Sequence, residues 1–347
     1  RMDDIGDSLR ETILNENIEL LISNKIQPTA LPNGFVPVDI DVTPMENSKS
    51  KKEGVSRTYK GFDGYAPMMA YIGTEGYAIN FELREGKQHC QNGTVEFLQE
   101  TIRLCKKLTD QPLLVRLDSG NDSIDNVAVL IDAGCYFIIK RNLRRESKDG
   151  WFDMAKQYCK NITTPRDGKT VYVGSDWKDV CSKQFEKEFT LRAGYEITER
   201  TVDKYGQILL IPEIEVETWW TNLGATDEEI IQLYHAHGEC EQFHSEIKTD
   251  MDLERLPSGK FTTNALVLEL GLIAYNILRM IGQGTIGGRS PRQKRDVRRR
   301  RLHTVISNLI MMASHVATHA RQLIMGLGKS NVWRHLFADF CESSVAL

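Results

Sequence analysis

The chain has 347 residues, of which 41% are hydrophobic and 27% are charged, and this composition is typical of a soluble globular protein with two or three domains. A net charge of −4 argues against a general nucleic-acid coat protein, although a local basic surface can still serve a DNA enzyme. Seven scattered cysteines without a C-x-x-C pair argue against a zinc site and indicate reduced thiols in a cytoplasmic protein.

Residues 1–34 begin with apolar residues at helical spacing and end in Pro and Gly, so we interpret them as a helical segment that closes a preceding domain. Residues 35–42 alternate between apolar and other side chains, which predicts a strand with Asp39 and Asp41 on the same face. The next expected elements are a loop at 47–64, rich in Lys, Ser and Gly, and strands at 67–72 and 77–83.

Helices and strands then alternate along the chain. We expect a helix at 93–108, a strand at 113–117 that runs into Asp118, a helix at 124–133 and a strand at 135–140. Three strands in a meander, followed by helix, strand, helix and strand, is the order of an RNase H-like core. The sequence therefore predicts an α/β fold, an RNase H-like mixed sheet flanked by helices, formed by residues 35–140 and 226–282.

A β-rich insertion is expected at residues 141–225, because these residues are rich in Thr, Val, Tyr and Trp with Gly turns. At its end, Thr226 and Glu229 have the spacing of a capping box, which predicts a helix from Asp227 to about Lys248. The remaining expected elements are apolar helices at 262–282 and 302–325 and, over residues 283–347, a basic loop followed by a C-terminal helical region.

Three acidic residues are candidates for a metal-dependent site. Phosphoryl transfer on DNA is served by two divalent ions, and Mg²⁺ prefers carboxylate oxygens. Asp41 lies at the end of the first strand, and Asp118 directly follows the strand at 113–117. These strands are neighbours in an RNase H-like sheet, so we expect the two carboxylates to meet, with Glu241 as the third acid.

The predicted helix that carries Glu241 has one polar face. At about 100° per residue, four of its side chains fall within about 60° of one another; they are Tyr234, His237, Glu241 and Lys248. The rival acids Glu239 and Glu246 fall on the opposite side. This face therefore presents a carboxylate for metal and a cation for phosphate.

Four phrases, VDIDVTPMENS, TYKGFDGYAPMMAYIG, LDSGNDS and WWTNLG, resemble the insertion-sequence-1380 group of bacterial insertion-sequence DDE transposases. The helix spacing is similar to the Tyr-(2)-Arg-(3)-Glu-(6)-Lys signature of that clan, with His237 in the place of Arg. The resemblance extends from about Pro37 to Gly282. It implies an RNase H-like catalytic domain with a β-strand insertion between the second Asp and the Glu.

The resemblance also implies a cut-and-paste enzyme that cleaves DNA at transposon ends and transfers the 3′-OH strand into target DNA, with two Mg²⁺ or Mn²⁺ ions per active site. It carries the catalytic metal-ligand role onto Asp41, Asp118 and Glu241, and the phosphate-binding role onto Tyr234, His237 and Lys248. Because His binds phosphate more weakly than Arg, either His237 works at reduced strength or another cation replaces it. Asp39 is the rival of Asp41, and an Asp-x-Thr match to the family favours Asp41.

Two further features are candidates for DNA contact. Part of the basic stretch at 289–301 is expected to bind DNA phosphates, the alternative being a solvated loop; the residues in question are Arg298, Arg299, Arg300 and Arg301. Trp219 and Trp220 end the insertion, where related transposases stack an aromatic ring on a flipped base, and packing at the strand end is the preferred interpretation.

The expected partner is double-stranded DNA, namely the terminal inverted repeats and the target, in the cytoplasm of a bacterium. A homodimer is expected by resemblance, because two ends must be brought together. Two alternative functions stay open: an RNase H-like nuclease without strand transfer, and a domesticated, non-catalytic DNA-binding derivative of a transposase.

Overall fold

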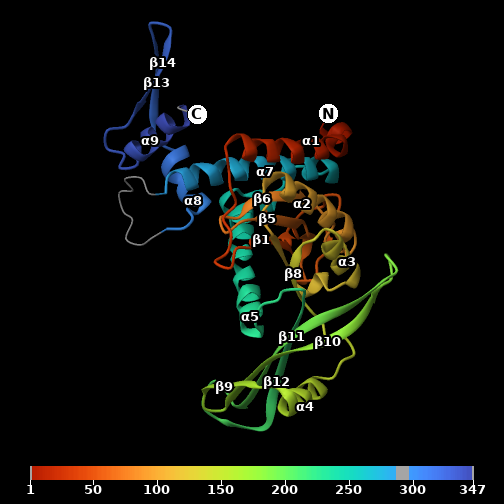
Figure 1. The fold of residues 1–347 in the computed structure, drawn as a ribbon. Coiled ribbons are helices and arrows are strands. Elements are labelled where there is room, and N and C mark those ends of the chain that lie inside the picture. The colour runs from red at the N-terminus through yellow and green to blue at the C-terminus, as the bar shows by residue number, and fades with distance from the viewer. Residues whose placement is uncertain (1, 287–296, 346–347) are drawn as a thin grey trace.

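In the computed structural model, which describes residues 2–286 and 297–345, nine strands form one mixed sheet in the order β6-β5-β1-β7-β8-β12-β11-β10-β9 (Figure 1). The core strands are β1 (Val36–Val42), β5 (Met68–Ile72), β6 (Tyr77–Glu82), β7 (Leu113–Leu117) and β8 (Tyr136–Lys140). β1 runs antiparallel to β5 and parallel to β7, and β7 runs parallel to β8. In chain order these five strands occupy the sheet as 3-2-1-4-5, which confirms the predicted RNase H-like core.

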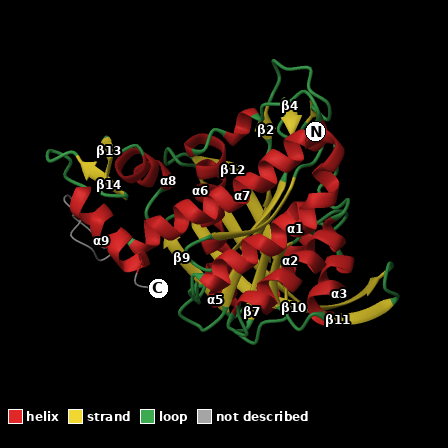
Figure 2. Ribbon diagram, turned by 90° about the horizontal axis from the view of Figure 1, so that it is seen from above, coloured by secondary structure: helices red, strands yellow, loops and turns green. Residues whose placement is uncertain are grey.

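Helices cover the core strands, and Figure 2 shows α1, α2 and α7 lying over the sheet. They are α1 (Met2–Ser23), α2 (Thr94–Leu108), α3 (Ile124–Asp132) and α7 (Phe261–Gly284). α1 packs against α7 and β6, and its Leu14, Ile18 and Leu21 are fully buried in the main hydrophobic core. The N-terminal helix therefore contributes to the same core as the sheet, while its assignment to the end of a preceding domain stays a prediction.

α7 is long and apolar enough to cross a membrane by length and composition, and it is the one such helix in the described part of the chain. Half of its most apolar window is buried inside the protein. Its buried Asn276 donates to the carbonyl of Ala78 at 2.7 Å, and its buried Arg279 forms an ion pair with Glu246. These contacts with the sheet and with the segment after α6 are those of a core helix, as the sequence predicted.

The predicted β-rich insertion is present, and it extends the core sheet. It contains α4 (Lys148–Tyr158), β9 (Asn161–Arg166), β10 (Lys169–Ser182), β11 (Lys187–Val202) and β12 (Ile208–Thr221). Residues Trp219 to Thr221 of β12 pair antiparallel with β8, and beyond this junction the long strands extend past α5 (Asp227–His235), with α4 beside them (Figure 1). The insertion strands therefore continue the core sheet at the edge of β8.

Two expectations about local structure are wrong. The long helix expected at 302–325 is replaced by α8 (Leu302–Val305), a π-helical turn (Ile306–Ile310) and a hairpin of β13 (Ser314–His319) and β14 (Gln322–Leu327), before α9 (Arg334–Val345). Ala320 and Arg321 both have positive φ (50° and 62°), which suits a tight hairpin turn and breaks a helix. The two strands of the hairpin have six residues each, and runs of this length fit either period, so spacing could not separate hairpin from helix.

The expected loop at 47–64 contains a small second sheet. It is formed by β2 (Met45–Glu46), β3 (Ser56–Arg57) and β4 (Asp63–Tyr65), in the order β2-β4-β3. Gly64 allows the strands to approach closely, because a Cβ at this position would lie 1.9 Å from the carbonyl oxygen of Met45. The segment is therefore built as a hairpin, and its tip lies beside the end of β1.

Candidate active site

Asp41 and Asp118 lie next to each other at the ends of two neighbouring parallel strands. The register places Ile40 of β1 opposite Leu117 of β7, so the residue that follows each of them is an aspartate at the same edge of the sheet. Both aspartates line a cavity of about 660 Å³. The sheet thus brings together two predicted site residues that are far apart in the sequence.

Asp41 has an unusually high pKa because it is buried and lies beside Asp118. Burial, and then the nearby charge of Asp118, raise the pKa of Asp41 to about 7, although His237, the amide of Val42 and Lys60 act in the opposite direction. The amide of Val42 donates to Asp41 Oδ1 at 2.7 Å and fixes that oxygen. A partly buried carboxyl group that keeps its proton because a second carboxylate lies beside it is under electrostatic repulsion. A bound cation would remove that repulsion.

The predicted helix faces this pair from the other side of the cavity. The capping box of Thr226 and Glu229 starts α5 (Asp227–His235), and the chain continues through a 3-10 turn (Ala236–Glu239), α6 (Cys240–Ser245) and a π-helical turn (Glu246–Asp250). All four side chains of the predicted polar face line the cavity: Tyr234, His237, Glu241 and Lys248. Glu239 lines a different cavity, and Glu246 is buried against Arg279.

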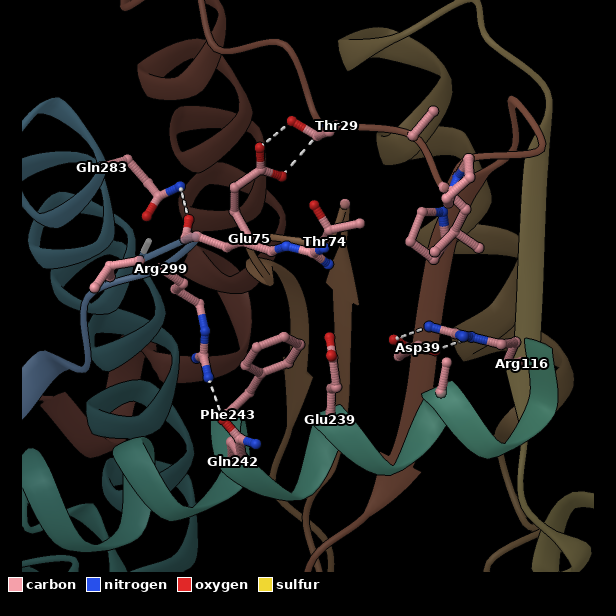
Figure 3. Close-up of a pocket in the computed structure, with 18 of the residues that line it drawn as sticks. Thr29, Asp39, Thr74, Glu75, Arg116, Glu239, Gln242, Phe243, Gln283 and Arg299 are labelled. Carbon is pink, nitrogen blue, oxygen red and sulfur yellow. Dashed lines mark hydrogen bonds and ion pairs between the residues drawn. The ribbon is translucent and has the colours of Figure 1, made fainter. Parts of the chain in front are cut away.

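Asp39, the rival of Asp41, is fully engaged in a buried ion pair. Arg116 donates from Nε to Asp39 Oδ1 at 2.6 Å and from Nη2 to Oδ2 at 2.8 Å. Burial raises the pKa of Asp39, but Arg116 and His237 outweigh it and hold the pKa at about 2. Figure 3 shows Asp39 and Arg116 on the wall of a second cavity of about 1130 Å³, which Asp41 does not line. Asp39 therefore has a structural role, as the ion-pair partner of Arg116.

His237 is the second partner of Asp39. Its Nδ1–H donates to Asp39 Oδ1 at 2.8 Å, and the imidazole is buried. Burial lowers the pKa of His237, but the charge of Asp39 outweighs it and the net shift is upward. The residue at the place of the signature Arg thus has one nitrogen committed to a carboxylate.

Lys248 and Tyr234 line the cavity with other partners. Lys248 Nζ donates to the carbonyl of Pro44 at 2.9 Å and lies 3.6 Å from Glu254. The Tyr234 ring packs against Trp219, with ring centroids 5.6 Å apart, and against His237 at 5.9 Å. Their phosphate-binding role stays a prediction.

Three residues of the cavity were missed by the sequence analysis. His244, three residues after Glu241 on the same helix, places Nδ1 3.9 Å from Asp41 Oδ2. Tyr59 and Lys60 also line the cavity, from the tip of the β3–β4 hairpin. Helical spacing could have found His244, whereas the hairpin tip gives no signal in periodicity because it reaches the site through the tertiary fold.

The donor set fits a hard divalent cation, because the paired carboxylates of Asp41 and Asp118 supply the oxygen ligands that Mg²⁺ prefers. The carboxylate of Glu241 lines the same cavity. Within the described residues, however, no group of three Asp, Glu, His or Cys side chains is arranged to hold a metal ion.

The predicted DNA-binding arginines are mostly tied to the protein. Arg299 forms an ion pair with Glu246 at 2.9 Å. It also donates to Gln242, a contact that Figure 3 shows. Arg300 is buried and donates to Thr285, and Arg301 pairs with Asp250 at 2.9 Å. Arg298 has no ion pair among the described residues, and residues 289–296 of the basic stretch lie outside them. DNA contact by these arginines stays a prediction.

Trp219 and Trp220 are buried, with 0% and 4% of their surface exposed. The indole N–H of Trp220 donates to Asp122 at 3.0 Å, and the guanidinium of Arg141 lies 4.2 Å from its ring centroid. In this conformation both rings pack at the junction of insertion and core, which agrees with the preferred interpretation.

The sequence matches a family described as "Transposase DDE domain group 1" over residues 10–344. A comparison with curated proteins finds no match. Among solved structures, the fold is similar to a piggyBac transposase in a synaptic complex with hairpin DNA, at 11% sequence identity and a TM-score of 0.38. The similarity covers 72% of this chain and 47% of that chain, so the chain spans about half the length of that protein.

Proposed function

Because this chain belongs to the family of transposase DDE domains of group 1, we propose that it cleaves DNA at the ends of a transposon and joins the freed 3′-OH strand to target DNA. The observation that carries the proposal is the pairing of Asp41 with Asp118 in one cavity, faced by Glu241. Two neighbouring carboxylates in a partly enclosed cavity repel each other when both are charged, and a bound cation removes this cost.

The catalytic residues of the proposal are Asp41, Asp118 and Glu241, as ligands of two Mg²⁺ or Mn²⁺ ions. When bound, the ions activate the attacking oxygen and stabilise the leaving oxygen of an in-line displacement. Asp41 presents Oδ2 to the cavity, because its Oδ1 accepts the amide of Val42. His244 Nδ1 lies 3.9 Å from Asp41 Oδ2. Tyr234 and Lys248 line the path on which the DNA phosphate would lie.

The partner of this site is proposed to be double-stranded DNA, both transposon end and target. Assignment to the insertion-sequence-1380 group, a bacterial cytoplasmic location and a homodimer that holds two ends belong to the same proposal. The phrase TYKGFDGYAPMMAYIG, which suggests that group, forms the turn between β3 and β4, then β4 and β5.

The decisive experiment supplies a pre-cut DNA end with a 3′-OH, a supercoiled target plasmid and Mg²⁺. Joined product supports the proposed transposase. Cleavage of DNA without joining would favour an RNase H-like nuclease, and binding without either reaction would favour a non-catalytic derivative. An Asp118→Asn variant provides the control. It should give no joined product if the cavity of Asp41 and Asp118 is the active site.

A further inference from the structure

The cavity of the acidic residues contains a cation that the sequence analysis missed. Lys60 lines the cavity of Asp41 and Asp118 and is exposed to solvent. Among the described residues no carboxylate lies within ion-pair distance of its ammonium. Its charge acts on the site. It opposes the upward shift in the pKa of Asp41, and it adds to the downward shift that burial causes in the pKa of His244. Lys60 is therefore a cation that lines the cavity of the acidic residues without forming an ion pair with any described carboxylate.

The fold holds Lys60 at a defined place. Tyr59 and Lys60 are the central residues of a tight turn, in which the amide of Gly61 donates to the carbonyl of Thr58 at 3.0 Å. Gly61 has a φ of +83°, a conformation that favours glycine. The turn is closed by the amide of Thr58, which donates to the carbonyl of Phe62 at 2.9 Å. This turn is the tip of the hairpin formed by β3 and β4.

Tyr59 ties the hairpin tip to the strand that carries Asp41. Its hydroxyl donates to the carbonyl of Val42 at 3.4 Å, one residue beyond Asp41. Burial raises the pKa of Tyr59, and the charges of Asp41 and Asp118 raise it further, so the hydroxyl stays protonated as a donor. The tip therefore stays beside the acids while the Lys60 side chain is free to move.

The other cations that line the cavity are already bound. Lys248 donates to the carbonyl of Pro44, and His237 is held by Asp39. A signature Arg at position 237 would add a permanent cation, and this chain has none there. The ammonium of Lys60, which lines the same cavity, is in a position to supply the missing charge.

Building on the proposed function, we propose that Lys60 binds the DNA phosphodiester that enters the cavity, and so replaces the signature Arg. The ligand is a phosphate diester, which an ammonium on a flexible stem binds as a point charge. The β3–β4 hairpin thereby becomes the second wall of the DNA-binding site, facing the α5–α6 helix.

The test uses the whole chain, Ca²⁺ in place of Mg²⁺, and a short DNA duplex of arbitrary sequence. Surface lysines are acylated with and without duplex, and each site is quantified by mass spectrometry. We expect DNA to slow acylation of Lys60 several-fold and to leave Lys51 unchanged, because Lys51 is exposed on the same segment but does not line the cavity. Equal acylation of Lys60 with DNA bound would overturn the inference.

Variants give a second measurement. Lys60→Ala should lower the slope of log Kd against log salt by about one, and it should slow nicking of a supercoiled plasmid in Mg²⁺ by about a hundredfold. Lys60→Arg should retain most of the salt slope and most of the nicking rate, and Lys51→Ala should match the wild type in both measurements. A Lys60→Ala protein with wild-type slope and nicking would contradict the inference even if its fold is intact.

Failure of the proposed function has a different signature. A wild-type chain that binds duplex and protects Lys60 but never cuts DNA would remove the cleavage reaction and support the phosphate contact. A wild-type chain that does not bind duplex at low salt would overturn both.

Discussion

The imidazole Nδ1 of His237 lies 2.8 Å from Oδ1 of Asp39, inside the helix face that was expected to hold phosphate. The other oxygen of that carboxylate accepts from Arg116 at 2.8 Å. One buried carboxylate thus ties the helix that carries Glu241 to the central strands β1 and β7. This contact separates the roles of the two neighbouring aspartates, and the following predictions depend on it.

Asp41→Asn should abolish strand cleavage, while Asp39→Asn should retain measurable cleavage. Asp41 shares the cavity with Asp118, and Asp39 is committed to Arg116 and His237. The measurement is nicking of a supercoiled plasmid in Mg²⁺, with each variant first shown to be folded by circular dichroism. Equal losses in the two variants would show that Asp39 belongs to the catalytic site.

Asp39→Asn should instead lower the free energy of unfolding, by about 3 kcal/mol near neutral pH, because it leaves Arg116 without its buried charge partner. The pKa of Asp39 is lowered from 3.8 to about 2, so its stabilisation is present above pH 3.8 and is lost as the pH falls towards 2. The raised pKa of His237 adds stability that is complete below its ordinary value of 6.5 and is lost as the pH rises through the raised value.

The difference in unfolding free energy between wild type and Asp39→Asn should therefore be largest between pH 3.8 and 6.5 and should narrow towards pH 2. Urea denaturation at a series of pH values measures it. A difference that is constant with pH would contradict the buried network.

His237→Ala should cost about 1–3 kcal/mol of stability, because Asp39 loses one of its two partners. The salt dependence of DNA binding should stay at the wild-type slope if His237 holds Asp39 and not phosphate. Fluorescence anisotropy with a labelled duplex over a salt series measures this slope. A slope lower by about one would assign His237 to the phosphate after all.

Trp219→Ala should destabilise the protein by about 3–5 kcal/mol, because the ring is fully buried between the insertion and α5. Trp177→Ala is the matched control, since that ring lies in the same insertion and is 64% exposed. Its effect should stay within about 0.5 kcal/mol. Denaturant midpoints of the two variants give the comparison, and similar midpoints would show that Trp219 is not a packing residue.

Local patterns in the sequence determined much of this fold. Alternation predicted β1, and helical spacing with a capping box at Thr226 predicted the helix of Glu241. These predictions succeeded because strand and helix periods repeat over a few residues and fix which side chains share a face. The same spacing separated Glu241 from Glu239 and Glu246, which lie away from the cavity.

Only the tertiary structure decided between Asp39 and Asp41. Alternation puts both on the same face of one strand, and the deciding partner, Arg116, lies opposite Asp39 on a strand that the chain reaches much later. The place of Lys60 was hidden for the same reason, because a hairpin tip meets the site through packing and not through spacing. Periodicity fixes a side chain's face, whereas its charge partner depends on which distant strand the register brings opposite.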